Sequence, residues 1–274
     1  MITAVYFVVA AVFVGLMVWW LLFKPGSEYR KAVQKPFPAE WQTILFRNLP
    51  IYRNLSKEQQ SELQDLIKAF LHQKNFVGCD GQLITDEVRV TIAAEACLLL
   101  LNRPHTLYRQ LKYIYVYPSA YLAPHTEVAE GGVVTHRKQG RSGESWQNGK
   151  VILSWDDVAH GARNFSDGQN VVLHEFAHQL DQESGTANGA PLLNQVSSYQ
   201  SWARVLSREF EELQDDLMRG HRGLLDHYGA TNPAEFFAVA TETFYERPDK
   251  MMQEHPELFE QLMAYFQVDP RKWQ

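Results

Sequence analysis

The residues best suited to catalysis lie in the stretch VVLHEFAHQLD at positions 171–181. It contains the pattern H-E-x-x-H, and on a helix His174 and His178 lie one turn apart, so both imidazoles can bind one ion. Glu175 is turned away from them by about 100°. Two imidazoles and a nearby carboxylate suit Zn²⁺, which in catalytic sites takes three protein ligands and keeps one position for water. The pattern predicts hydrolysis of peptide bonds, with Glu175 as the general base acting on that water.

The context of the H-E-x-x-H pattern distinguishes it from a chance match. With ten histidines in the chain, the pattern arises in roughly 2% of shuffled sequences of this composition. Here it is embedded in an apolar helical segment, as a buried active-site helix would be. A plain core helix would need a buried partner for each of the three polar side chains.

A third metal ligand must come from another part of the chain. The residues after His178 are QLDQESG, which excludes the longer motif with a third histidine on the same helix. The downstream candidates are His221, His227, Glu235 and Glu242. Glu235 and Glu242 are seven residues apart and share one helix face, so one could bind the metal while the other orients a ligand.

Two of these acidic residues also have purely structural interpretations. Asn232 could be an N-cap, Pro233 the first helical residue and Glu235 the reciprocal partner in a capping box. Asp181 could accept a proton from a ligand imidazole and fix its tautomer, or could be a solvated carboxylate at the end of its helix. Spacing alone leaves both questions open.

Three segments resemble the Mlc titration factor A family of zinc peptidases. They are HEFAHQLD (174–181), YGATNPAEFFAV (228–239) and SGESWQNGKVILSW (142–155). The likeness extends over residues 38–274. That family is similar in its catalytic domain to anthrax lethal factor, and the shared pattern is H-E-x-x-H followed later by a tyrosine and, seven residues on, a glutamate.

In this chain the later tyrosine and glutamate are Tyr228 and Glu235. The resemblance implies that Glu235, rather than Glu242, is the third zinc ligand. It also implies that Tyr228 donates a hydrogen bond to the oxyanion that develops on the attacked carbonyl. The family name further implies binding to a glucose-regulated transcriptional repressor, a contact to which no residue of this chain can be assigned.

The pattern of apolar residues predicts an α+β, zincin-like domain with a small mixed sheet and a mostly helical C-terminal half. A capping box at 56–59 begins one helix, and another runs from about 86 to 102. YIYVYP (113–118) and VILSW (151–155) predict strands, and helices follow at about 167–183, 199–219, 233–246 and 256–266. VILSW could be an edge strand along which an extended peptide binds, or a plain core strand.

The N-terminal run at 2–23 contains no charged residue. As a helix it would be about 33 Å long, enough to cross a hydrocarbon layer of about 30 Å, and it lacks the features of a cleaved signal peptide. Four basic residues follow at 24, 30, 31 and 35, so the positive-inside rule predicts a single-pass protein of the inner membrane with its catalytic domain in the cytoplasm. The predicted parts are an anchor at 1–23, a linker at 24–37 and a peptidase domain at 38–274.

Composition limits the partners. The formal net charge is −6, from 26 basic and 32 acidic side chains. No cluster of Lys and Arg follows residue 36, which argues against direct binding of nucleic acid. The expected partners are a peptide or protein substrate, the membrane and, by resemblance, a transcriptional repressor. The alternative function is that of a membrane-tethered regulatory protein that sequesters such a repressor, with hydrolysis secondary.

Overall fold

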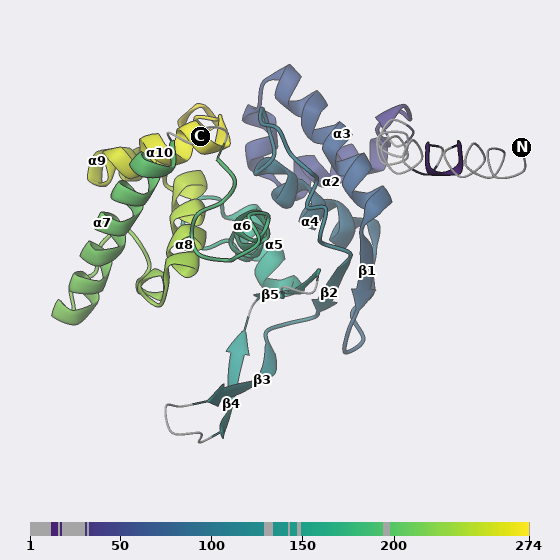
Figure 1. Ribbon diagram of the computed structural model, residues 1–274. Coiled ribbons are helices and arrows are strands. Elements are labelled where there is room, and N and C mark those ends of the chain that lie inside the picture. Colours follow the sequence, from purple (N-terminus) through teal and green to yellow (C-terminus); the bar gives the residue numbers. More distant parts are fainter. Residues whose placement is uncertain are drawn as a thin grey trace, which may run out of the picture.

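The computed structural model describes residues 12–15, 17, 31, 33–128, 134–141, 143–146, 149–193 and 198–273. Within this part, four strands form a sheet in the order β1 (Asn75–Gly78), β2 (Tyr113–Tyr117), β6 (Lys150–Ser154) and β5 (Gly143–Trp146). The first three run parallel and β5 is antiparallel to β6. This confirms the predicted combination of helices with a small mixed sheet. A separate antiparallel pair, β3 (Tyr121–Val128) and β4 (Val134–Arg141), extends away from the main body (Figure 1).

Of the two interpretations of VILSW, an edge strand or a core strand, the structure confirms the core strand. The predicted strand at 151–155 corresponds to β6, which pairs with β2 on one side and with β5 on the other. Both of its ladders are therefore occupied, and Trp155 already begins helix α5 (Trp155–Arg163). Among the described strands, β5 is the one at this edge of the sheet, and it contacts the helix that carries the H-E-x-x-H pattern.

The helices before β2 form one side of the molecule, and the helices after α6 form the other (Figure 1). The first group is α2 (Ala39–Asn48), the 3₁₀ turn η1 (Pro50–Asn54), α3 (Lys57–Gln73) and α4 (Asp86–Leu98). The second is α7 (Ser198–Arg219), η2 (His227–Ala230), α8 (Pro233–Glu246), α9 (Pro248–Glu254), α10 (Pro256–Phe266) and η3 (Pro270–Trp273). The predicted boundaries of α8 and α10 are confirmed. So is the capping box of α3, in which Ser56 and Gln59 each accept the other's backbone N–H at 3.2 Å.

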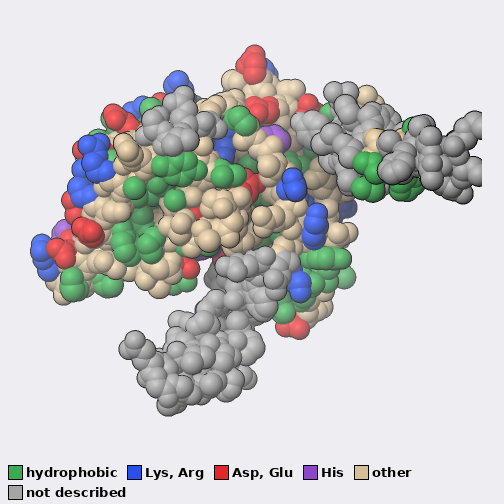
Figure 2. Space-filling view, in the orientation of Figure 1, with side chains coloured by type: hydrophobic (Ala, Val, Ile, Leu, Met, Phe, Trp, Pro, Cys, Tyr) green, Lys and Arg blue, Asp and Glu red, His purple; other side chains and the backbone are tan. Residues whose placement is uncertain are grey.

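Helix α6 (Val171–Gln182) lies between these two sides and contacts α4, α5, α8, β5 and β6. Its apolar face is buried: Leu173 and Phe176 are inaccessible to solvent, and the Phe176 ring packs edge-on against that of Tyr108 at 4.8 Å. The polar residues His174, Glu175 and His178 of the same helix are the site candidates. On the surface, acidic and basic side chains are interspersed over the described part of the face shown in Figure 2.

The predicted membrane localisation is contradicted. A spanning helix needs about 20 consecutive apolar residues, and within the described part of the chain no helix is both long and apolar enough to cross a membrane. Most of the predicted span at 2–23 lies outside the described residues, which include only 12–15 and 17 of it. The assignment to the inner membrane as a single-pass protein is therefore corrected. The division into an anchor, a linker and a domain remains a prediction.

Candidate metal centre and active site

The two histidines of α6 face the same side of the helix. Asn170 caps the helix, because its side-chain oxygen accepts the backbone N–H of Leu173 at 3.0 Å. The rings of His174 and His178 follow one and two turns later, with centroids 4.9 Å apart and planes inclined at 82°. Both rings are largely buried. The helix therefore presents two imidazoles to one point, as the spacing predicted.

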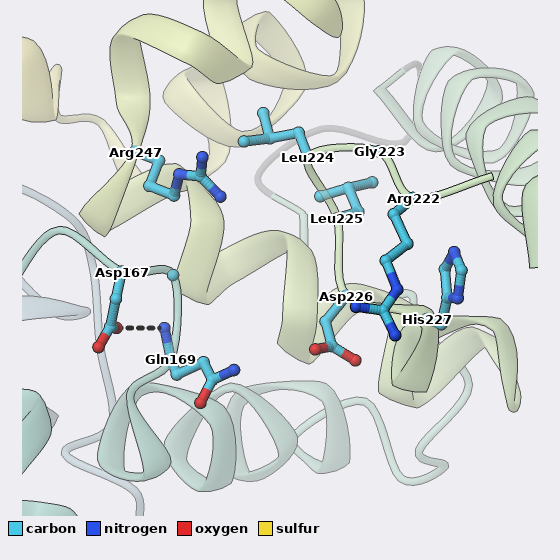
Figure 3. Close-up of a pocket in the computed structure, with 10 residues that line it drawn as sticks. Asp167, Gln169, Arg222, Gly223, Leu224, Leu225, Asp226, His227 and Arg247 are labelled. Atoms are coloured by element: carbon cyan, nitrogen blue, oxygen red, sulfur yellow. Dashed lines mark hydrogen bonds between the residues drawn. The ribbon is translucent and has the colours of Figure 1, made fainter.

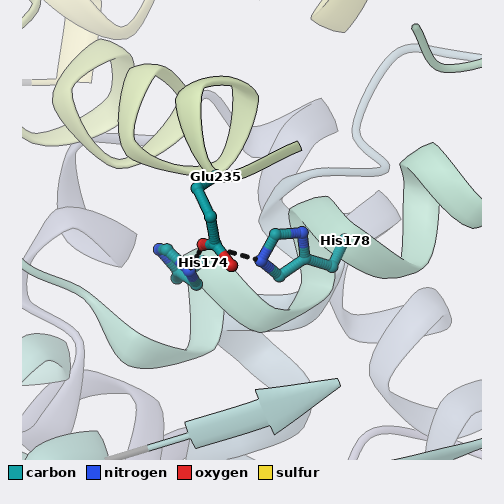
Figure 4. A group of neighbouring side chains, drawn as sticks. All are labelled: His174, His178 and Glu235. Atoms are coloured by element: carbon teal, nitrogen blue, oxygen red, sulfur yellow. Dashed lines mark hydrogen bonds and ion pairs between the residues drawn. The ribbon is translucent and has the colours of Figure 1, made fainter. Parts of the chain in front are cut away.

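Glu235 of α8 meets both histidines from the opposite helix (Figure 4). Its Oε2 lies 3.0 Å from Nε2 of His174 and 3.2 Å from Nε2 of His178. One potential ligand atom from each of the three residues lies within 4.8 Å of the others. Two imidazole nitrogens and a carboxylate oxygen make a donor set that fits a divalent transition metal.

The start of α8 explains how Glu235 reaches this position. Asn232 is the N-cap and accepts the backbone N–H groups of Ala234 and Glu235 at 2.9 and 3.0 Å, and Pro233 is the first helical residue. The structural interpretation of this segment is thus right for Asn232 and Pro233. The carboxylate of Glu235, however, contacts the histidines, so the cap fixes its backbone and leaves its side chain for the site.

Glu242 lies two turns further along the same face of α8. Its Oε1 is 2.7 Å from Nδ1 of His174, and its Oε2 accepts the backbone N–H of Asn170 at 2.6 Å. A carboxylate on Nδ1 keeps the proton there and leaves Nε2 free to bind a metal. The geometry therefore gives Glu235 and Glu242 different positions: the first faces both histidines, and the second holds one of them from behind.

Charge inside the cluster is balanced between the two helices. Burial disfavours the charged form of His174, but Glu242 and Glu235 outweigh it and hold the imidazole pKa well above its ordinary value. Burial likewise raises the pKa of Glu235, but hydrogen bonds from His174 and His178 hold it well below its usual range. The cluster therefore favours a positively charged imidazole beside a carboxylate.

Glu246 is a residue that the sequence analysis missed. It lies one turn after Glu242, and its Oε2 accepts the backbone N–H groups of Gly168 and Gln169 at 2.7 and 3.0 Å. Together with the bond from Asn170 to Glu242, three consecutive N–H groups before α6 are held by α8. Burial is the main cause that raises the pKa of Glu246 to about 9.

We call Glu242 and Glu246 the carboxylate clamp. The sequence signal for Glu246 is its spacing: it follows Glu242 by four residues and so lies on the helix face that Glu235 and Glu242 share.

Glu95 of α4 is a second missed residue. Its side chain is fully buried, and its Oε1 accepts a hydrogen bond from Nδ2 of Asn170 at 2.7 Å. Burial raises its pKa to about 8. Its sequence signal is a lone charged residue within the apolar run IAAEACLLLL. Asn170 also donates its backbone N–H to Glu242 and caps α6 with its side-chain oxygen. Glu95 therefore fixes a residue that connects α6 with α8.

Glu175 and Tyr228, the other two predicted catalytic residues, differ in their exposure to solvent. Glu175 is only 5% exposed, and within the described structure its Oε2 has no hydrogen-bond partner. Burial raises its pKa to about 7, against the opposing effect of the two histidines. Tyr228 is 52% exposed, and its ring centroid is 5.9 Å from that of His174.

The η2 turn fixes Tyr228 relative to α8. A side-chain carbon at Gly229 would lie 3.2 Å from Leu213 and 3.3 Å from Val239, so any larger residue there would push these neighbours away from the turn. Asp226 accepts the backbone N–H of Tyr228 at 2.8 Å. The turn thus places Tyr228 at the same helix that supplies Glu235.

The remaining sequence candidates lie outside the cluster. Asp181 is buried, and its Oδ2 accepts the backbone N–H of Gly189 at 2.7 Å, so it fixes the loop after α6. His221 Nδ1 pairs with Asp216, and His227 Nε2 donates to the backbone oxygen of His221 at 2.8 Å. Among the described residues, neither of these histidines belongs to the group whose ligand atoms converge.

Comparison with known proteins gives a consistent result. A family profile described as "Glucose-regulated metallo-peptidase M90" matches residues 24–267. An uncharacterized protein of Synechocystis sp. is 41% identical over 242 residues, which cover 88% of this chain and 88% of that protein. The Mlc titration factor A proteins of Cronobacter sakazakii and Yersinia pestis are 31% and 28% identical. Their alignments cover 85% and 93% of this chain, and 87% and 92% of theirs.

Proposed function

Because the chain belongs to the glucose-regulated metallo-peptidase M90 family, we propose that it is a zinc-dependent peptidase with a zincin-like site. The observation that carries this proposal is the meeting of His174, His178 and Glu235, with ligand atoms within 4.8 Å of one another. This donor set has the composition of catalytic zinc sites, which keep one position for water. Zinc, when bound, lowers the pKa of a water molecule and polarises the substrate carbonyl.

The side chains around the metal ligands have separable roles in this proposal. Glu175 accepts a proton from the attacking water and delivers it to the leaving amine. Tyr228 donates a hydrogen bond to the oxyanion that develops on the carbonyl. Its half-exposed ring beside His174 supports this role, because the group has to reach a substrate. Glu242 keeps Nε2 of His174 available to the metal.

The edge strand β5 is a candidate binding site for the backbone of the substrate. A strand at the edge of a sheet offers unpaired N–H and C=O groups to an extended peptide. β5 contacts α6, so a peptide added there would run past the helix that carries the histidines. This contact supports an extended conformation for the bound substrate.

The decisive experiment is the substitution Glu175→Gln. The purified variant should keep one zinc per chain, measured by elemental analysis, but should lose cleavage of an unstructured peptide library by at least about a hundredfold. Glu260→Gln, an exposed position on α10, is the matched control and should behave like the native protein. Cleavage at the native rate in Glu175→Gln would refute the assignment of the base.

The choice between Glu235 and Glu242 as the third ligand is tested by metal content. Glu235→Ala should lose stoichiometric zinc, because a ligand atom is removed. Glu242→Ala should still bind zinc, with an affinity lower by about 10- to 100-fold. The reverse pattern would make Glu242 the ligand and Glu235 the supporting residue.

A second candidate function follows from the relatives named Mlc titration factor A. In it the protein binds and sequesters a transcriptional repressor, and hydrolysis is secondary. The buried Glu175, with an oxygen that has no partner in the described structure, favours the enzyme, since a binding module has no use for it. A Glu175→Gln variant that still binds a repressor would show that the two functions are separable.

A further inference from the structure

A cavity of about 410 Å³ opens between the segment before α6, the segment that leads into η2 and the residue after α8 (Figure 3). Three segments line it: Asp167–Gln169 before α6, Arg222–His227 before and within η2, and Arg247 directly after α8. Each segment continues into an element of the site, since α6 carries the histidines, η2 carries Tyr228 and α8 carries Glu235. The cavity is therefore formed by segments that adjoin three elements of the proposed active site.

Two guanidinium groups from different segments line this cavity. Arg222 is exposed on the loop before η2, and Arg247 is half-buried at the end of α8. Arg247 lies across Gly168, where a side-chain carbon would be 3.1 Å from its Cδ. Among the described residues, Arg222 and Arg247 each have no ion pair or hydrogen bond from the side chain. Each of these guanidinium groups is suited to a carboxylate, which it can bind through two parallel hydrogen bonds.

The two acidic side chains of the cavity are already engaged as acceptors. Asp167 accepts from Nδ2 of Asn164 and from the backbone N–H of Gln169, and pairs with Nε2 of His160. Asp226 accepts the backbone N–H of Tyr228. Their carboxylates therefore serve the local fold, whereas the guanidinium groups are left for a ligand. Leu224 and Leu225, both buried, add an apolar surface that suits the methylene groups of a side chain.

We propose that this cavity is a substrate subsite that binds a carboxylate. The carboxylate belongs either to an Asp or Glu side chain near the scissile bond or to the C-terminus of a short peptide. This inference rests on the proposed peptidase function, because it names the class of peptide that the site prefers. Arg222 and Arg247 are its binding residues.

The test compares matched peptides with the native protein. Starting from one cleaved peptide, a single Glu at successive positions is compared with Gln, and a free C-terminus is compared with an amide. We expect kcat/KM to be about tenfold higher for one acidic form, the size of one charge-assisted hydrogen bond. A preference for Glu over Gln would assign the carboxylate to a side chain, and a preference for the free C-terminus over the amide would assign it to the end of the peptide. The preference should also weaken at high salt.

Substitutions then assign the preference to the two arginines. In Arg222→Gln and in Arg247→Gln the ratio of acidic to neutral kcat/KM should fall towards one, while Arg219→Gln should keep the native ratio. Arg219 is the matched control, because it is exposed, lies three residues before Arg222 and pairs with Asp215 outside the cavity. Equal cleavage of all forms by the native protein would overturn the subsite and leave the peptidase function intact.

A binding measurement keeps the inference testable if no peptide is cleaved. Fluorescence anisotropy with Glu175→Gln protein and labelled acidic and neutral peptides reports affinity without hydrolysis. Tighter binding of the acidic peptide that is lost in the Arg222→Gln and Arg247→Gln backgrounds would support the subsite. Equal affinities would overturn it, whatever the fate of the proposed chemistry.

Discussion

At the scale of single residues, the three glutamates on one face of α8 differ in what they contact. Glu235 lies at two imidazole nitrogens, Glu242 at one imidazole and one backbone N–H, and Glu246 at two backbone N–H groups. One side-chain type thus serves as candidate ligand, as orienting group and as anchor, depending on its position along the helix. Because these contacts differ, removing each carboxylate should have a different effect.

Glu95 makes a specific contribution to the dependence of stability on pH. Its pKa is about 8 in the folded protein against an ordinary 4.5, so between these values the folded state keeps a proton that the unfolded state has lost. The free energy of unfolding therefore falls as pH rises from about 4.5 to 8, by up to about 5 kcal/mol from this group. Below pH 4.5 both states are protonated and the contribution is constant.

Glu95→Gln removes this titration and keeps an oxygen that can accept from Asn170. We expect the Tm of the variant, relative to the native protein, to increase steadily between pH 5 and pH 8. Thermal unfolding monitored by circular dichroism at several pH values measures this difference. Glu211→Gln, an exposed position on α7, should give a difference that does not change with pH. A constant difference for Glu95→Gln as well would contradict the prediction.

At the scale of elements, the site is a junction between α6 and α8. The carboxylate clamp binds the backbone of the segment directly before α6, and the cap at Asn232 sets the start of α8. Gly189 brings the loop after α6 against α8, because a side-chain carbon there would lie 2.4 Å from the backbone oxygen of Pro233. Contacts with α8 therefore fix α6 both before His174 and after His178.

Loss of the α8 cap should affect both stability and metal binding. Asn232→Ala should lower the free energy of unfolding by about 1 kcal/mol and also weaken zinc affinity, because Asn232 holds the backbone of Glu235. Ser56→Ala removes the cap of α3, which is not part of the metal site, and is the matched control. Chemical unfolding should show similar losses for both variants, and a zinc competition titration should show a loss for Asn232→Ala alone. Equal zinc affinity in the two variants would argue against a role of the cap in placing the ligand.

Elements with a strong local pattern could be predicted from the sequence, and those that depend on distant partners could not. The ends of α8 follow from Asn232, Pro233 and an apolar period, all of which are local. The order of the strands depends on pairing between segments far apart, so the sequence predicted a strand at 151–155 but left open whether it is an edge or an internal strand. The same limit applies to Glu95, whose partner Asn170 is 75 residues away.

At the scale of the whole molecule, α6 contacts elements from both sides of the fold, and α8 belongs to the later side (Figure 1). A metal held by His174, His178 and Glu235 would join residues 61 positions apart in sequence. Such a ligand binds the folded state and stabilises it in proportion to the logarithm of its concentration over its Kd.

Removal of metal should therefore destabilise the entire domain. At a zinc concentration of about 1,000 times Kd the stabilisation is about 4 kcal/mol, so a chelator should lower the Tm of the native protein by roughly 10 °C. Differential scanning calorimetry of the native protein and of Glu235→Ala, each with and without chelator, measures this effect. The variant should show little change. An equal fall in both proteins would place the stabilising metal elsewhere.

The position of the carboxylate clamp also has a consequence for how the protein is made. Glu246 holds the backbone of Gly168 from 78 residues further along the chain, and Glu235 follows His174 by 61. Synthesis proceeds from the N-terminus, so the histidine helix leaves the ribosome before its third candidate ligand and before the side chains that anchor it. A nascent chain at that stage offers two histidines and no assembled site. Metal loading therefore follows translation of α8, and the cell has to supply the ion to a nearly complete domain.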